Sequence, residues 1–224
     1  MKSIEAYKRF LLKINKFDSN DDIRISKGEF VILFNDEAKR WQNQKLKENN
    51  STSEINDLEV LLVNDFELIK VNEKQNYANF ELPSNFFKIT DCSVFAKTDN
   101  CAVKKLHCIN LKPKFKSSRL NDAMSSPSFE WEETFYIVSN DLLQAYTDGN
   151  FKIDKVFLDY YKLIPEIDIE GYINILGEAS TTIDPIINGT SINEVINRCV
   201  VECLRNYQNP ELFQQSLQRI QTES

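Results

Sequence analysis

The sequence is poor in several residue types on which common chemistries depend. It holds one histidine, five glycines and six prolines in 224 residues. Glycine lets the backbone approach phosphates closely, so this scarcity argues against a nucleotide-binding loop, and no Walker, dinucleotide, kinase or hydrolase motif occurs. Any reaction scheme that needs an imidazole has only His107 to use. We therefore expect no catalysis.

Positive charge and long apolar runs are also in short supply. The 27 Lys and Arg residues face 34 Asp and Glu residues, a net charge of −7. This balance disfavours a nucleic-acid-binding protein, although an acidic wall would suit a channel through which DNA slides without sticking. No apolar run approaches the roughly 18–20 residues of a membrane-spanning helix. The charged start of the chain lacks the apolar centre of a signal peptide, so we expect no membrane association.

The five cysteines are Cys92, Cys101, Cys108, Cys199 and Cys203. An odd count without a secretion signal is typical of reduced thiols in a cytosolic setting. Together with His107, the first three have the right chemistry for zinc, but no C-x-x-C pair occurs and adjacent residues of a strand point to opposite faces. The last two lie one helical turn apart and are expected to act as small apolar residues. We expect neither a metal nor another cofactor.

Residues 1–50 are predicted to form an N-terminal helical arm of two helices. Apolar residues recur at three- and four-residue steps in the first, at Ile4, Tyr7, Leu11 and Ile14. The second opens with Ser26 and Glu29 in the register of a capping box, in which each side chain satisfies a free amide of the first turn.

Residues 51–175 are predicted to form a β-rich core domain. In "FEWEETFYIV" the apolar residues alternate with polar ones, which is typical of a half-buried strand with Phe129, Trp131, Phe135 and Ile137 on one face. Asp148 and Gly149 lie between two apolar runs and predict a tight hairpin. The returning run, 157–161, is apolar on both faces and should be central in a sheet, with pairing ending near Pro165.

Residues 176–224 are predicted to be a C-terminal helical segment that folds with the core domain. Ser191 and Glu194 predict a second capping box, followed by an apolar stripe and, after Pro210, a short last helix. The fold class expected is α+β: an N-terminal helical pair, an antiparallel, sandwich-like middle and C-terminal helices.

Four segments in order resemble one protein family: "FELPSNFFKI", "PSFEWEETFYI", "AYTDGNFKIDKVFLDYYKLIPEIDIEGY" and "TTIDPIINGTSINEVINRCVVECLRNY". Together they are similar to the head–tail connector (ring) proteins of crAss-like bacteriophages, over residues 80–207. The resemblance implies a virion structural protein without catalysis or cofactor, in a twelve-fold homo-oligomeric ring of the phage neck, assembled in the host cytoplasm. It further implies contact with the portal protein and with adjacent ring or tail proteins, and genomic DNA passing through the channel without sequence-specific binding.

Subunits of a closed ring bury side surfaces against their neighbours. The candidate interface residues are Tyr7, Leu11, Trp41, Tyr160, Pro165, Pro185, Tyr207, Phe213 and Leu217. A plainer interpretation stays open for the tyrosines and the prolines. Tyr160 and its neighbour Tyr161 would belong to the subunit's own core, and Pro165 and Pro185 would only end the elements before them.

Two other functions remain open. One is that of a monomeric β-sandwich binding module of a tail-fibre or glycan-binding type. The other is that of a hydrolase that uses His107 and a pair of carboxylates. A ring protein assembles whereas a binding module stays monomeric, and a hydrolase would lose turnover on His107→Ala.

Overall fold

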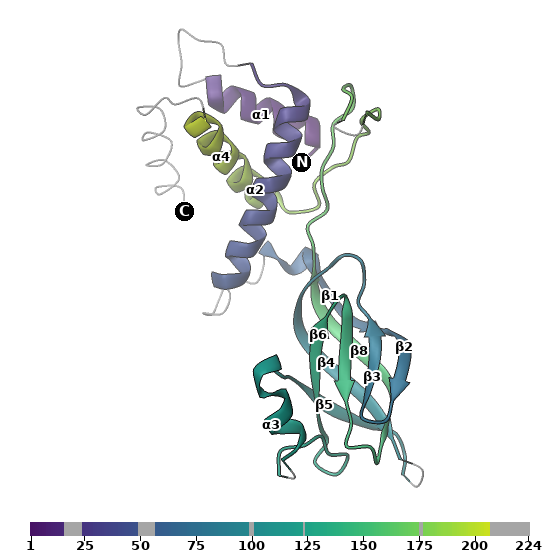
Figure 1. The fold of residues 1–224 in the computed structure, drawn as a ribbon. Helices are drawn as coiled ribbons and strands as arrows, with labels where there is room; N and C mark the ends of the chain where they lie inside the picture. The colour runs from purple at the N-terminus through teal and green to yellow at the C-terminus, as the bar shows by residue number, and fades with distance from the viewer. Residues whose placement is uncertain (16–23, 49–56, 99–100, 123, 175–176, 207–224) are drawn as a thin grey trace. The chain divides into compact units, whose positions relative to one another are not determined.

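The computed structural model describes residues 1–15, 24–48, 57–98, 101–122, 124–174 and 177–206. Helices lie towards both ends of the chain, and an eight-stranded mixed sheet lies in the middle (Figure 1). This arrangement confirms the α+β class. The chain divides into two compact units, a helical unit of residues 1–61 and 164–224 and a sheet unit of residues 62–163.

The C-terminal segment belongs to the helical unit and not, as expected, to the β-rich core. Its helix, α4 (Gly189–Asn206), contacts both N-terminal helices, α1 (Ser3–Asn15) and α2 (Lys27–Glu48). The apolar stripe of α4 is buried in these contacts, with Ile192, Ile196 and Cys199 fully enclosed. One core shared by three helices therefore joins the two ends of the chain, and the sheet unit is shorter than residues 51–175.

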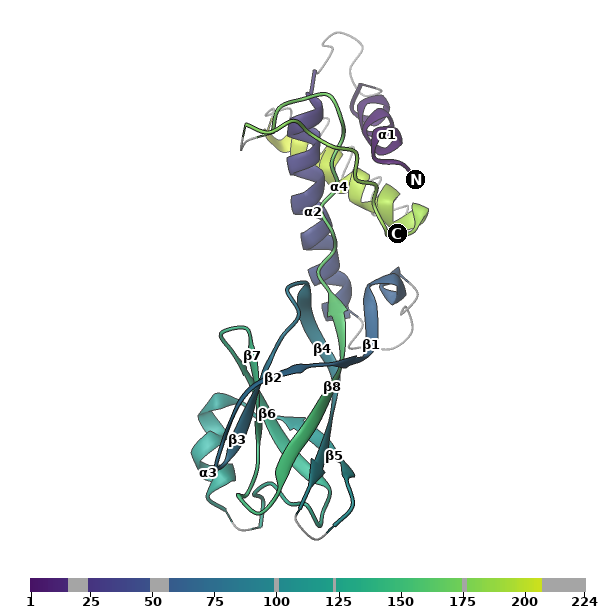
Figure 2. The same cartoon turned by 90° about the vertical axis from the view of Figure 1, so that its right-hand side faces the viewer.

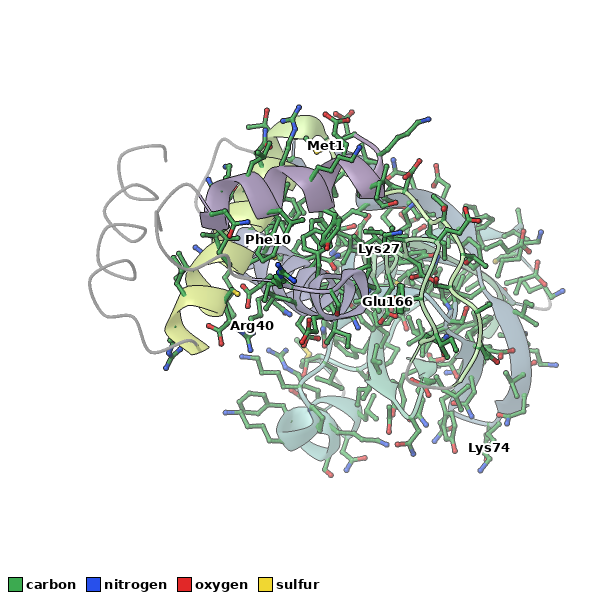
Figure 3. The ribbon with its side chains drawn as sticks, turned by 90° about the horizontal axis from the view of Figure 1, so that it is seen from above. Met1, Phe10, Lys27, Arg40, Lys74 and Glu166 are labelled. Carbon is green, nitrogen blue, oxygen red and sulfur yellow. The ribbon has the colours of Figure 1, made fainter. Side chains whose placement is uncertain are left out.

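Aromatic rings fill the core of the helical unit. The Phe30 ring lies 5.1 Å from that of Phe10 and 5.6 Å from that of Phe34, centroid to centroid. Figure 3 shows Phe10 on the side of α1 that faces α2. The predicted capping box is confirmed, because the Glu29 amide donates to Ser26 Oγ at 3.2 Å and Glu29 Oε2 accepts from the Ser26 amide at 2.7 Å.

The predicted cap of α4 is wrong. The helix starts at Gly189, and the cap is Asn188, whose Oδ1 accepts a hydrogen bond from the Ser191 amide at 2.8 Å. Glu194 is instead engaged across the core, where it accepts from Trp41 Nε1 at 2.9 Å. Asn is as good a cap as Ser, so the two candidates could not be separated by residue type.

The sheet order is β1-β8-β4-β5-β6-β7-β3-β2. Neighbours are antiparallel except β5 and β6, which are parallel. The middle is therefore one mixed, curled sheet where the sequence suggested an antiparallel, sandwich-like one. The strands are β1 (Leu62–Glu67), β2 (Ile69–Lys74), β3 (Tyr77–Glu81), β4 (Phe86–Lys97), β5 (Lys104–Asn110), β6 (Glu133–Ser139), β7 (Leu142–Tyr146) and β8 (Lys152–Lys162). A short helical turn, η3 (Glu59–Leu61), precedes β1.

The sheet is curled, and its two edge strands, β1 and β2, follow one another in the sequence. Only Leu68 separates β1, which pairs with β8, from β2, which pairs with β3 (Figure 2). The Leu68 amide donates to Val156 O of β8 at 2.9 Å, and the Lys70 ammonium donates to Ile153 O. One core inside the curl draws buried side chains from β3 to β8, among them Phe80, Leu106, Leu143 and Leu158.

The predicted hairpin at Asp148 and Gly149 is half right. A tight turn is present, with Gly149 at φ +87°, and the Asn150 amide donates to Asp148 Oδ1 at 2.8 Å. However, the strands it joins, β7 and β8, are not neighbours in the sheet. β8 is central, between β1 and β4, as expected, and ends at Lys162, three residues before Pro165.

The strand predicted at "FEWEETFYIV" begins later than expected. β6 starts at Glu133, and Phe135 and Ile137 do share one face of it. Before β6 the chain turns, because Ser128 and Glu133 exchange two backbone hydrogen bonds of 2.9 and 3.1 Å and Glu132 has φ +56°. Trp131 therefore lies at the tip of this turn and not in a strand.

Candidate functional site

Two of the candidate interface residues are fully engaged in their own units. Trp41 is 0% exposed and bonds to Glu194, and Tyr160 is 2% exposed and donates from its hydroxyl to Asn85 Oδ1 at 3.0 Å. These positions agree with the plainer interpretation for Tyr160. Neither side chain is presented at the surface of its unit.

The other candidates differ in their accessibility. Tyr7 is half-buried, with its hydroxyl donating to Ile25 O at 2.7 Å, and Leu11 is half-buried beside Leu12, which is 72% exposed. Pro165 is exposed and Pro185 is half-buried. The last three candidates, Tyr207, Phe213 and Leu217, lie outside the described residues. Two of the described candidates are thus buried in different units, and the other four are exposed or half-buried in the helical unit.

The most exposed aromatic residue of the described chain is one that sequence reasoning assigned to a buried face. Trp131 is 82% exposed at the tip of the turn before β6, where its amide donates to Ser128 Oγ at 3.2 Å. Met124, 94% exposed, lines the same hollow of about 1000 Å³ as Trp131 and Phe129. We call Met124 and Trp131 the tip. A Trp side chain that a hydrogen-bonded turn keeps exposed to solvent is typical of a residue that a binding partner covers.

A second exposed apolar place lies on β2. All six residues of this strand are exposed, including Ile69 at 70% and Val71 at 51%. We call Ile69 and Val71 the strand patch. The pairing of β2 with β3 shifts register between Lys70 and Asn72, so a bulge lies within the patch. Edge strands with exposed apolar side chains are ready places for another chain to bind.

The helical unit contains a groove of about 520 Å³ between α2 and the extended chain that follows β8. Its walls are the apolar side chains of Val31, Ile32 and Ile173, with Asp168 and Tyr172 at the polar end. Two amide side chains of α2 hold the extended chain. Asn35 both donates to Ile167 O at 3.1 Å and accepts from its amide at 2.9 Å, while Gln42 Oε1 accepts from the Ile164 amide at 3.0 Å.

One ion pair and one lysine hydrogen bond support the same attachment. Lys39 pairs with Glu166 at 2.6 Å, and Lys27 Nζ donates to Glu170 O at 2.8 Å. Figure 3 labels Glu166 close to α2, whose first residue is Lys27. Because Asn35 and Gln42 are seven residues apart, they share one face of the helix. The seven-residue spacing of the two amide side chains could have predicted a helix face that binds the backbone of another segment, but sequence reasoning did not use it.

Asp168 organises the far end of this extended chain. Its carboxylate accepts hydrogen bonds from the Tyr172 hydroxyl at 2.7 Å, the Ile169 amide at 2.8 Å and the Thr181 amide at 2.9 Å. Burial alone would raise the pKa of Asp168, but these three donors outweigh it and hold the pKa below its ordinary value. Burial, followed by the Asp168 carboxylate, raises the pKa of Tyr172 to about 12. At neutral pH the Asp168 carboxyl is therefore ionised and the Tyr172 hydroxyl is protonated. We call this hydrogen-bonded pair the clasp.

The residues considered for zinc or acid–base chemistry are dispersed. His107 is exposed on β5 opposite Ser93, whereas Cys108 beside it is buried, as the strand geometry predicted. Cys92 is buried inside the sheet unit, and Cys101 is exposed. Within the described ranges, no three His, Cys, Asp or Glu side chains come together in a way that would hold a metal ion.

Three of the buried cysteines have raised pKa values. Burial raises the pKa of Cys108 well above its usual value, with further contributions from Cys92 and Asp91. Burial also raises the pKa of Cys199 well above the ordinary range and that of Cys203 to about 11. Since the thiolate is the nucleophile and the metal ligand, these three cysteines act as core residues.

No family model and no curated protein matches this sequence. In the part of the chain that the structure describes, no helix has both the length and the apolar character to cross a membrane.

Proposed function

We propose that this chain is a structural subunit of a virion, forming a ring in the head–tail connector of a crAss-like bacteriophage. The observation that carries the proposal is the ordered series of segments between residues 80 and 207 that resembles those connector proteins. In this role the ring lies beneath the portal, touches adjacent ring or tail proteins and surrounds the DNA channel.

The surface of the sheet unit supports the proposal in a specific way. A closed ring is built from head-to-tail contacts, in which two different surfaces of the subunit meet. The three most exposed apolar side chains of the sheet unit are Met124 and Trp131 in the tip and Ile69 in the strand patch. We assign the tip and the strand patch to the two sides of the contact between neighbouring copies.

The test is the mass of the full chain in solution, measured by analytical ultracentrifugation over a range of concentrations. The proposal predicts assembly beyond the 26.1 kDa monomer, lost in Trp131→Ser and in Ile69→Ser/Val71→Ser. Ile186→Ser, which changes an exposed isoleucine outside both places, is the matched control and should assemble normally. A wild-type chain that stays monomeric, alone and with a portal ring, contradicts the proposal.

The alternative is a monomeric binding module of a tail-fibre or glycan-binding type. In that case the exposed Trp131 would stack on a sugar ring beside the hollow of the tip. A monomeric mass together with glycan binding that Trp131→Ser abolishes would favour this function over the ring.

A further inference from the structure

The negative net charge of the chain conceals a strongly basic segment. Residues 104–119, "KKLHCINLKPKFKSSR", contain no acidic residue. We call their six cationic side chains the basic strip: Lys104, Lys105, Lys112, Lys114, Lys116 and Arg119. So dense a charge of one sign is unusual in a protein whose overall charge is −7.

The basic strip is fixed to the sheet unit. It runs along β5, through the turn η4 (Pro113–Phe115) and into the short helix α3 (Lys116–Leu120), which lies against the outside of the sheet (Figure 1). Leu111 and Leu120 attach it to an apolar cluster of β6 and β7 formed by Phe135, Ile137 and Tyr146. The Lys116 ammonium lies 5.1 Å from the centroid of the Tyr146 ring. The charges are thus displayed at fixed places rather than on a loose tail.

Most of this charge has no counterpart nearby. Lys104 pairs with Glu132 at 3.1 Å. Within the described ranges, the other five cations form no ion pair within 4 Å. Arg119 acts on Asp122 from a greater distance, as one of the minor causes that lower the pKa of that carboxyl. All of Lys112, Lys114, Lys116 and Arg119 are exposed.

A hollow beside the strip adds an aromatic surface to the charge. It has a volume of about 400 Å³, and its lining includes Lys112, Arg119 and Phe115 together with Glu133 and Met124 of the tip. Phe115 is 48% exposed, and the Lys114 ammonium lies 4.8 Å from its ring centroid. Proteins that hold single strands place an exposed ring among cations in this way, and the cations by themselves serve the phosphates of a duplex.

We propose that the basic strip binds the phosphate backbone of nucleic acid, without sequence preference. Contacts of this kind come from Lys and Arg side chains that replace the counterions of the backbone. An acidic protein surface is the competing occupant, but lysine is depleted from the cores of protein interfaces, and five of the six cations here are lysines. The inference stands on the strip alone and does not depend on the connector function.

The overall charge makes the binding weak. We expect a dissociation constant of roughly 10⁻⁴–10⁻⁶ M for the full chain, as is usual for non-specific contacts. The logarithm of the affinity should fall linearly with the logarithm of the salt concentration, with a slope near −0.9 for each phosphate neutralised.

The experiment is fluorescence anisotropy of a labelled DNA duplex of about 20 base pairs titrated with the full chain between about 50 and 200 mM salt. Lys112→Gln/Lys114→Gln/Lys116→Gln should weaken binding at least tenfold and reduce the salt slope by about 2–3. The matched control removes the same charge from exposed lysines elsewhere on the sheet unit, in Lys74→Gln/Lys97→Gln/Lys152→Gln. It should change the affinity less than about threefold.

Three results would overturn the inference. They are no duplex binding by the wild-type chain at the lowest salt, equal losses in the two triple variants, and tighter binding of poly-glutamate than of DNA. The second would mean that only bulk charge matters, and the third would assign the strip to an acidic protein partner. Circular dichroism of the triple variants checks that the sheet unit is intact. Self-assembly of the wild-type chain is measured in a separate experiment, so a failure of the connector function is distinguishable from a failure of this inference.

Discussion

At the scale of the residue, the two tryptophans of the chain occupy opposite environments. Trp41 is enclosed among the three helices, where its indole donates to Glu194, and Trp131 stands in solvent at a turn. Sequence reasoning placed Trp131 on the apolar face of a strand and named Trp41 as a candidate interface residue. It could not separate them because the alternation around Trp131 looks like a strand, and the turn that interrupts it depends on backbone bonds between Ser128 and Glu133.

This contrast predicts different results for the two conservative substitutions. Trp41→Phe removes a buried hydrogen bond to a carboxylate and should lower the free energy of unfolding of the helical unit by about 1–3 kcal/mol. Trp131→Phe should leave stability within about 0.5 kcal/mol. Denaturant unfolding measures both, and acrylamide quenching of the remaining tryptophan should be weak in Trp131→Phe and strong in Trp41→Phe. Strong quenching of Trp41 would contradict its burial.

Asp168 supplies the pH dependence expected at this scale. Its folded pKa is lowered, so the clasp contributes stability above the unfolded value of about 3.9 and loses it as the pH falls through the folded pKa. Hydrogen exchange of the Thr181 amide, corrected for its intrinsic rate, should accelerate below about pH 4 in the wild-type chain. Asp168→Asn should be fast already at neutral pH, and the exposed Glu178→Gln should behave as wild type. Unchanged exchange in Asp168→Asn would exclude the clasp.

At the scale of the element, nearby residues determine caps and turns, whereas the pairing of strands depends on segments that are distant in the sequence. The capping box at Ser26 and the central place of β8 were predictable, because each depends on residues close together in the chain. The turn at Gly149 was also predictable, but the pairing of β7 with β3 and β6 was not. A turn fixes where a chain reverses, whereas the neighbours of a strand are chosen by the whole sheet.

The attachment of the extended chain to α2 is the clearest element-scale prediction. Gln42→Ala leaves the Ile164 amide buried without its acceptor, so it should destabilise the helical unit by about 1–3 kcal/mol. Hydrogen exchange at Ile164 should speed up together with this loss. Asn43→Ala changes the adjacent amide side chain, which is exposed and donates to Lys39 O within α2, and should have little effect. Equal effects of the two variants would mean that Gln42 does not hold the chain.

At the scale of the whole molecule, composition was a poor guide to where surfaces lie. A net charge of −7 predicted an acidic protein, yet 16 consecutive residues of the sheet unit carry six positive charges and no negative one. Likewise the apolar stripe predicted for residues after Ser191 is not a free surface, because α4 buries it against α1 and α2. The three most exposed apolar side chains of the sheet unit, Met124, Trp131 and Ile69, lie before β6 and on an edge strand.

If the tip and the strand patch meet across one contact, mixing variants should reveal it. A Trp131→Ser chain keeps its strand patch, and an Ile69→Ser/Val71→Ser chain keeps its tip. Each alone should be monomeric, whereas an equal mixture retains one good contact and should form heterodimers that do not grow further. Sedimentation velocity measures this. A mixture that remains monomeric would show that the two places do not bind each other.

The most direct test of the central claim, that copies of this chain close into a ring, is electron microscopy of the purified full-length chain together with a portal ring. The account predicts particles with rotational symmetry, in which several copies surround an open channel. Isolated single subunits under conditions where the portal ring itself is intact would contradict it.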